Sequence, residues 1–82
     1  MNVTFEFCGE LQRLAGAGEL SLSMPAGSLT VAAALAALAQ RLPQLQERLP
    51  RCACAVGDVL VRRGDVLAAN ARLALLPPVA GG

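Results

Sequence analysis

Apolar and polar residues alternate strictly in two segments near the start of the chain. Residues 3–7 read Val-Thr-Phe-Glu-Phe, and residues 19–24 read Glu-Leu-Ser-Leu-Ser-Met. Side chains two positions apart lie on the same face of a strand, so each segment predicts a strand with one buried face. Residues 10–14 lie between Gly9 and Gly16 and predict one or two turns of helix.

A helical period replaces the alternation after residue 30. The apolar residues at positions 31, 35, 38 and 42 are three or four apart, which places them along one stripe of a helix. Thr30 is a good N-cap, alanines fill much of the segment, and Pro43 ends or kinks it. We therefore expect one main helix from Val31 to about Leu42, followed by a short helical turn over residues 44–49.

The second half of the sequence predicts three more strands. Residues 52–56 and 59–61 are mostly apolar and are joined by a turn at Gly57-Asp58. The apolar residues 73–76 predict a central strand, and residues 62–65 predict a polar turn. Two strands, one main helix and three further strands predict an α+β fold, in which the helix packs across one face of a mixed sheet of about five strands.

Composition narrows the class of protein. The chain has 82 residues, enough for one core, and it is 55% hydrophobic and 16% charged, which excludes a disordered chain. A net charge of +1 without a basic tract argues against nucleic acid as the main partner. No apolar run approaches the roughly 20 residues that cross a bilayer, and the first residues lack a basic signal region. We expect a cytoplasmic protein that does not associate with membranes.

The three cysteines, Cys8, Cys52 and Cys54, offer little chemistry of their own. An odd number does not suit a disulfide framework, and a zinc site would need a fourth ligand in a sequence without histidine. A redox role for Cys52-Ala53-Cys54 is the alternative, but this pair lacks the helix N-terminus that activates C-x-x-C thiols. We interpret the cysteines as small apolar core residues and expect no metal site.

The last six residues, Pro77-Pro78-Val79-Ala80-Gly81-Gly82, hold the distinctive chemistry of the chain. The two prolines lock φ and lack N–H donors, which favours an extended segment. The two glycines have no Cβ, so they fit a channel too narrow for other residues. Such a stalk suits an enzyme that activates a C-terminal carboxylate, whereas the alternative is a frayed end. We divide the chain into a domain of residues 1–76 and an extended tail of residues 77–82.

Three segments carry a family resemblance. Residues 5–16 read Phe-Glu-Phe-Cys-Gly-Glu-Leu-Gln-Arg-Leu-Ala-Gly, Thr30-Val31 is followed by Leu35, and residues 75–82 read Leu-Leu-Pro-Pro-Val-Ala-Gly-Gly. They resemble the first strand with its "LRELAG"-like helix, the start of the main helix, and the "PPVAGG" ending of the MoaD-type sulfur carriers, the small subunits of molybdopterin synthase. The ending is the most specific element. The resemblance implies a ubiquitin-like β-grasp fold with a flexible C-terminal Gly-Gly tail.

The resemblance also implies a chemistry for that tail. An E1-like enzyme would use ATP to adenylate the carboxylate of Gly82, and sulfur would displace AMP to give a thiocarboxylate. The tail would then enter the large subunit of molybdopterin synthase, in a heterotetramer, and donate sulfur to cyclic pyranopterin monophosphate to build the dithiolene. A sulfur-donor protein is the third implied partner, and no cofactor is bound stably. The implied partner-binding residues are Leu75, Leu76, Pro77, Pro78, Val79, Ala80 and Gly81.

Three other functions remain open at this point. A carrier for thiamine thiazole synthesis would use the same tail chemistry, although such carriers tend to lack the short helix of residues 10–14 and the double proline. A ubiquitin-like modifier would instead join Gly82 to lysines of target proteins. A plain interaction domain would have an inert end. The chain itself has no histidine and no lysine, so it is poorly equipped to catalyse a reaction alone.

Overall fold

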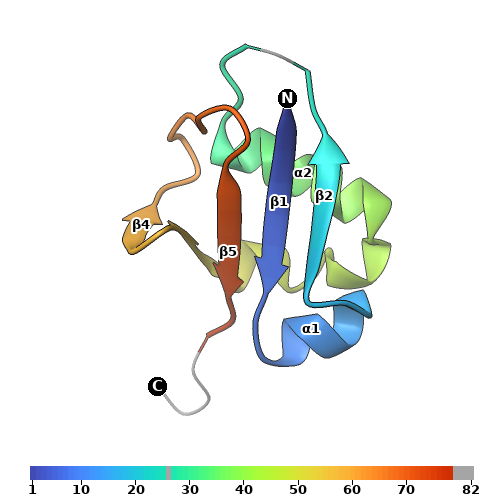
Figure 1. Cartoon of the computed structure of the whole chain (residues 1–82). Coiled ribbons are helices and arrows are strands. Elements are labelled where there is room, and N and C mark those ends of the chain that lie inside the picture. Colours follow the sequence, from blue (N-terminus) through green and yellow to red (C-terminus); the bar gives the residue numbers. More distant parts are fainter. Residues whose placement is uncertain (26, 79–82) are drawn as a thin grey trace.

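The computed structural model describes residues 1–25 and 27–78 and has two layers, a sheet and a main helix behind it (Figure 1). The elements are β1 Asn2–Phe7, α1 Glu10–Ala15, β2 Glu19–Ser23, α2 Val31–Arg41, the 3-10 turns η1 Pro43–Leu45 and η2 Leu49–Arg51, β3 Ala53–Val56, β4 Val59–Val61 and β5 Arg72–Leu76. The strands and both helices lie within about two residues of their predicted bounds. The single turn expected over residues 44–49 is instead two short turns, and each has a proline in its first two positions, Pro43 in η1 and Pro50 in η2.

The sheet has the strand order β2-β1-β5-β3-β4. The central pair, β1 and β5, is parallel, and every other neighbouring pair is antiparallel, so the predicted mixed sheet is confirmed. Because β1 and β5 run in the same direction, both end at the lower edge of the sheet in Figure 1, where α1 also lies. The helix α2 covers one face of this sheet and leaves the other face open.

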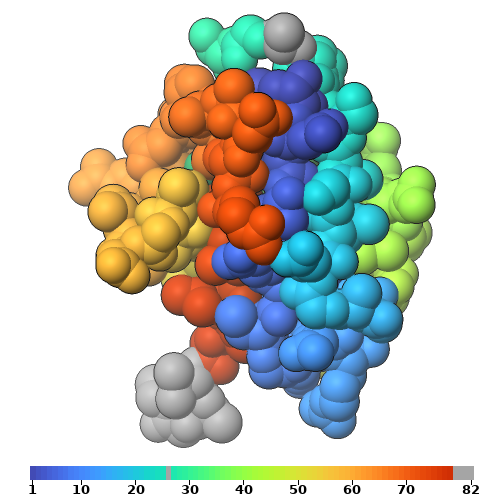
Figure 2. All heavy atoms as spheres, viewed as in Figure 1, coloured from blue at the N-terminus to red at the C-terminus, as the bar shows by residue number. Residues whose placement is uncertain are grey.

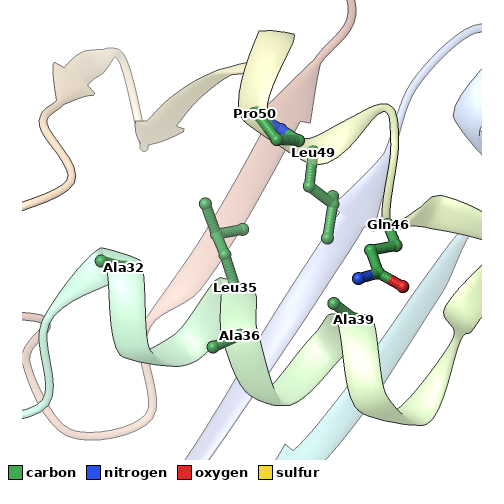
Figure 3. A pocket seen from close by; sticks show the side chains of 7 residues that line it. All are labelled: Ala32, Leu35, Ala36, Ala39, Gln46, Leu49 and Pro50. Atoms are coloured by element: carbon green, nitrogen blue, oxygen red, sulfur yellow. The ribbon is translucent and has the colours of Figure 1, made fainter.

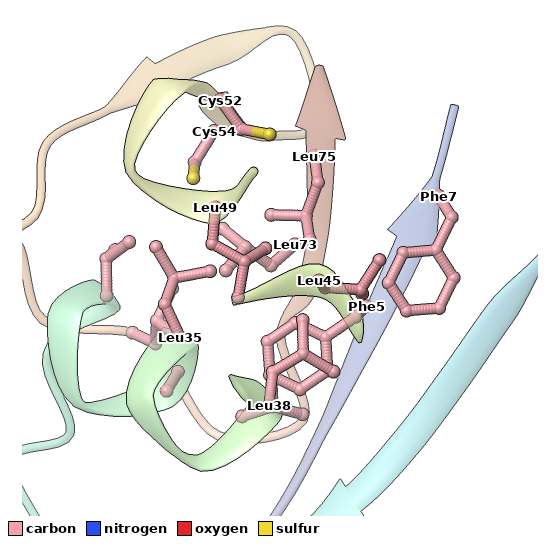
Figure 4. Close-up of a cluster of buried hydrophobic side chains, with 14 of the residues drawn as sticks. Phe5, Phe7, Leu35, Leu38, Leu45, Leu49, Cys52, Cys54, Leu73 and Leu75 are labelled. Atoms are coloured by element: carbon pink, nitrogen blue, oxygen red, sulfur yellow. The ribbon is translucent and has the colours of Figure 1, made fainter. Parts of the chain in front are cut away.

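The core fills the space between the sheet and α2 (Figure 4). The alternation predicted for β1 is confirmed, since Val3, Phe5 and Phe7 are buried on one face of the strand. On α2 the same holds for the predicted stripe at Val31, Leu35 and Leu38. The largest fully buried side chains are Phe5, Leu11, Leu38, Leu45, Leu73, Leu75, Val3, Val31 and Cys54.

The N-terminus of α2 is held by the segment that follows β4. The first backbone N–H groups of a helix have no partner within it. Here the predicted N-cap is confirmed, because the Thr30 hydroxyl accepts a hydrogen bond from the N–H of Ala33 at 3.1 Å. The N–H groups of Val31 and Ala32 donate to the carbonyls of Asp65 and Arg63, both at 2.9 Å. The segment after β4 therefore positions the main helix.

The side chain of Arg63 connects the segment after β4 to the residues from η2 to β3 through hydrogen bonds. Its Nη2 donates to the carbonyl oxygens of Leu49 at 2.9 Å and Cys52 at 2.7 Å, and its Nη1 donates to the Sγ of Cys54 at 3.3 Å. The guanidinium thereby joins η2 to β3. Our interpretation of residues 62–65 as a polar turn is therefore incomplete, since one of its arginines points into the protein.

Within the described ranges, 1–25 and 27–78, no helix is long and apolar enough to cross a membrane. The longest helix, α2, has 11 residues, whereas a helix that crosses a bilayer needs about 20. The structure thus has no transmembrane helix in these ranges.

Candidate functional site: the exit of the tail and the open sheet face

The segment predicted to bear the chemistry continues directly from the central strand β5. Phe7 of β1 pairs with Leu75 of β5, and Cys54 of β3 pairs with the same leucine from the other side. Leu75 has no exposed surface, so it supports the exit from within the core. Leu76 and Pro77 are partly exposed, and Pro78 is exposed. The start of the tail is therefore fixed on both sides by neighbouring strands.

Gly9 lies against the first proline of the tail. A Cβ on Gly9 would lie 3.5 Å from the Cγ of Pro77, which is van der Waals contact. Gly9 has a φ of +57°, a backbone conformation that residues other than glycine rarely adopt. The tight turn from β1 into α1 thus forms a wall beside Pro77. The sequence analysis used Gly9 only as a boundary, although a glycine two residues after a predicted strand was a signal for this turn.

The distal half of the predicted site lies outside the described residues. This applies to Val79, Ala80, Gly81 and Gly82, whose predicted roles therefore stay predictions. The predicted partner-binding roles of Leu75, Leu76, Pro77 and Pro78 also stay predictions. Leu75 is fully buried, whereas Leu76 at the end of β5 and the two prolines after it keep exposed surface.

The open face of the sheet is apolar on the side of β3 and β4. Ala55 lies opposite Ala74 on one side and opposite Leu60 on the other, and Ala53 lies opposite Leu76. Side chains alternate along a strand, and Cys54 and Leu75 point into the core, so these five residues point outward. Leu60 is 69% exposed and Ala53 is exposed, Ala74 and Leu76 are partly exposed, and Ala55 between them is only 8% exposed. We call Ala53, Ala55, Leu60, Ala74 and Leu76 the apolar half of the open face.

Polar side chains occupy the other half of the open face, over β1 and β2, the strands drawn in blue and cyan in Figure 2. Arg72 of β5 donates from Nε to the carboxylate of Glu6 at 2.8 Å and from Nη2 to the carboxylate of Glu19. These hydrogen bonds, first that to Glu6 and then that to Glu19, raise the pKa of Arg72. Beside them the hydroxyls of Thr4 and Ser21 lie 2.7 Å apart. The ion pairs therefore mark the boundary between the polar half and the apolar half.

The cysteines do not form a reactive centre. Burial raises the pKa of Cys52 and of Cys54, although the guanidinium of Arg63 opposes the shift. A thiol with a raised pKa has little thiolate at neutral pH and is a poor nucleophile. The interpretation of these two residues as core residues is confirmed by their burial, whereas Cys8 is partly exposed. Among the described residues, no three His, Cys, Asp or Glu side chains form a group that could hold a metal ion.

A groove of about 240 Å³ lies on the helix side of the molecule, between α2 and η2 (Figure 3). It has an apolar lining without a titratable side chain, so it offers no group for acid–base or nucleophilic chemistry. Its lining residues are Ala32, Leu35, Ala36, Ala39, Gln46, Leu49 and Pro50. The groove is thus separate from the exit of the tail and from the open face.

The arrangement of the sheet and main helix defines a ubiquitin-like β-grasp protein, of the class that includes sulfur carriers and ubiquitin-like modifiers. Residues 5–82 match the model of the ThiS family. Because this match spans nearly the whole sequence, the chain belongs to the ThiS family. The predicted fold class and the stated resemblance are both confirmed. Among curated proteins, none matches the sequence significantly.

Several solved structures share the fold. SAMP1 from Haloferax volcanii is 27% identical, with a TM-score of 0.88 and 100% of each chain covered. A chain in the complex of subunits 1 and 2 of molybdopterin-converting factor from Helicobacter pylori is 28% identical, with a TM-score of 0.69 and 100% of each chain covered. A Pyrococcus furiosus protein described as molybdopterin converting factor, subunit 1, is 18% identical, with a TM-score of 0.84, 96% of this chain and 99% of that chain covered. The last likeness supports the fold alone.

Proposed function

We propose that the chain is the sulfur-carrier subunit of a molybdopterin synthase and that it reacts through the carboxylate of Gly82. One observation carries the proposal. The family match extends to residue 82, and the segment that ends in Gly81-Gly82 continues from the central strand of the fold. A carrier needs its reactive end on a firm base, and β5 is held by strands on both sides.

The chemistry of the proposed site explains why the chain needs an activating enzyme. A free carboxylate is a poor electrophile. An oxygen of the Gly82 carboxylate attacks the α-phosphorus of ATP, pyrophosphate leaves, and the resulting acyl-adenylate carries AMP as a good leaving group. Sulfur supplied by a donor protein at the oxidation level of sulfide attacks the acyl carbon and AMP leaves, which gives the thiocarboxylate without a further redox step. ATP is consumed by the E1-like enzyme, and no cofactor is bound stably by the carrier.

In this scheme the folded domain binds the partner proteins, and the tail carries the reacting group. Among the described residues, Glu6, Glu10 and Glu19 form ion pairs with arginines. The apolar half of the open face borders the start of the tail through Leu76. An apolar area of this kind is typical of partner-binding sites. We assign this apolar surface to the binding of the large subunit of the synthase and of the activating enzyme. Each of these partners must hold the folded domain so that the tail reaches its active site.

The likeness to the Helicobacter pylori complex supports this choice of partner, because that structure contains two different subunits of molybdopterin-converting factor. We assign the large subunit to the apolar half of the open face. Sulfur passes from the thiocarboxylate to cyclic pyranopterin monophosphate and forms the dithiolene, and each transfer returns Gly82 to a carboxylate.

A ubiquitin-like modifier is the second candidate. Two structures of small archaeal modifier protein 1 from Haloferax volcanii, 27% and 26% identical to this chain, favour it. Both functions begin with adenylation of the same carboxylate, so the fold does not separate them. A modifier would transfer Gly82 to lysine amines, and conjugates would accumulate on target proteins. A carrier for thiazole synthesis, to which the family match applies equally, would differ only in the acceptor of sulfur.

We expect the chain to gain the mass of one oxygen-to-sulfur exchange when it is incubated with its activating enzyme, ATP and a sulfur source. Intact-mass spectrometry, followed by fragmentation, should confine the change to Gly82. Adding the large subunit and cyclic pyranopterin monophosphate should then remove the sulfur and yield molybdopterin. Stable conjugates with lysines would favour the modifier, and an unchanged mass beside a control carrier that becomes thiolated would contradict both.

A test of the proposed docking surface uses one arginine on each half of the open face. Ala74 lies in the middle of the sheet between Glu6 and Ala55, whereas Ser23 is exposed at the edge of β2. Ala74→Arg is expected to weaken binding of the large subunit by about tenfold or more, because it places a charge in an apolar contact. Ser23→Arg should change the affinity by less than about twofold. Calorimetry measures both, and equal effects would rule out the apolar half as the contact.

A further inference from the structure

The edge strand β4 is more exposed than the proposed docking surface explains, because that surface includes Leu60 but neither Val59 nor the outer edge of the strand. It is the last strand in the sheet order, so its outer side has no neighbouring strand in the described ranges. It lies at the margin of the sheet in Figure 1. Two of its three residues, Val59 and Leu60, are 66% and 69% exposed. An exposed apolar edge strand is a template for pairing with another strand.

The backbone of β4 offers hydrogen-bonding groups to such a partner. The turn from β3 has two residues, and Gly57 at its first central position has a φ of +61°, as a type II′ turn requires. The residues flanking a turn of this type exchange both hydrogen bonds. Val59 and Val61 therefore direct their N–H and C=O groups toward β3. The N–H and C=O of Leu60 point outward, away from the sheet.

The sequence around Leu60 is complementary to itself. Residues 58–62 read Asp-Val-Leu-Val-Arg. In an antiparallel pair of two copies centred on Leu60, each leucine faces its counterpart and each Val59 faces Val61 of the other copy. Asp58 of each copy then faces Arg62 of the other, so two opposite-charge pairs flank the apolar centre. Neither Asp58 nor Arg62 forms a side-chain ion pair within the described part of this chain.

Other arrangements of the two strands lose the pairing of Leu60 with Leu60 and of Asp58 with Arg62. A shift by one residue would turn the side chains of one strand to the opposite face. A shift by two would place Leu60 opposite Asp58 or Arg62. Parallel pairing would bring the two copies of Asp58, and of Arg62, close to each other. Charge complementarity therefore selects a second copy of this chain, in one register, as the occupant of the edge.

We propose that β4 pairs with β4 of a second copy, forming a two-fold symmetric dimer with a continuous ten-stranded sheet. The two copies of β5, the strand from which the tail continues, lie two strands from the new contact. A three-residue strand buries little area, and small interfaces bind weakly. The dissociation constant is on the order of 100 μM, and the dimer forms where the protein is concentrated.

Charge reversal tests the register. Asp58→Arg and Arg62→Asp are each expected to weaken dimerisation about tenfold, because each turns two attractive pairs into repulsive ones. The double variant D58R/R62D should restore the affinity of the unmodified chain. Sedimentation equilibrium between about 10 μM and 1 mM measures all four proteins, and circular dichroism checks their folds. A monomeric unmodified chain at 1 mM, or a double variant as weak as the single ones, would overturn the proposal.

A cysteine placed on the two-fold axis gives an independent check. In the Cys8→Ser background, Leu60→Cys should form an intermolecular disulfide under mild copper–phenanthroline oxidation, since paired Cα atoms lie about 5.5 Å apart. Val59→Cys is the matched control, because its side chain is equally exposed in the monomer but faces Val61 of the other copy. Faster cross-linking at position 60 supports the axis, and equal rates at both positions contradict it.

Discussion

Replacing Arg63 with methionine is expected to lower the free energy of unfolding by about 2–3 kcal/mol. The guanidinium donates hydrogen bonds to the carbonyls of Leu49 and Cys52 and to the Sγ of Cys54. Methionine keeps the apolar stem of the side chain as far as the position of Nε but lacks the guanidinium donors, so both carbonyls lose a charged partner. Urea denaturation measures the change.

Two further variants separate this effect from a general loss of charge. Arg62 is exposed, and its backbone N–H, which a substitution leaves in place, donates to the Asp65 carboxylate at 2.8 Å. Arg62→Met should therefore change the stability by no more than about 0.5 kcal/mol. Arg63→Lys should recover only part of the loss, because an ammonium cannot reproduce the planar guanidinium fork. These measurements use a few micromolar protein, a concentration well below the proposed dissociation constant of the dimer. Equal losses for Arg62→Met and Arg63→Met would refute the structural role of Arg63.

The prominence of Arg63 shows where prediction from the sequence reached its limit. Strands and helices follow from short-range patterns, and the alternation of β1 and the stripe of α2 identified the residues that form the core. The contact of Arg63 with Leu49 joins residues 14 positions apart. Nothing in the run Arg62-Arg63 tells which of the two arginines points inward. Only the three-dimensional path of the chain after β4 decides it.

The sequence likewise predicts one part of the candidate site, the chemistry of the tail, but not the other part, the apolar half of the open face. The composition of the tail and its resemblance to a known family predict the chemistry without any structure, because a terminal carboxylate after two glycines has few uses. The apolar half of the open face was not predictable, since three of its five members are alanines. They become one surface only through the register that places Ala74 beside Ala55 and Leu76 beside Ala53. A sequence pattern does not contain that register.

Deletion of Gly81-Gly82 is expected to abolish sulfur transfer while leaving the fold intact. The proposed reactive group is the carboxylate of Gly82, and the shortened chain would offer the carboxylate of Ala80, a residue with a methyl side chain, two positions too early to reach the active sites of its partners. All core residues of the described structure precede these glycines, so the stability should change by less than about 0.5 kcal/mol. Product formation by the reconstituted synthase and thermal denaturation measure the two effects.

The variant Gly82→Ala tests whether the loss comes from the narrowness of the partner's channel. It keeps the length of the tail and the terminal carboxylate but adds one methyl group at the tip. Adenylation should be impaired, because only glycine fits a channel that excludes a Cβ. Binding to the large subunit through the apolar half of the open face should persist, since Ala74 and its neighbours are unchanged. A deletion variant that still transfers sulfur would show that the reaction does not use the end of this chain, and an alanine variant that turns over normally would show that the channel is wide.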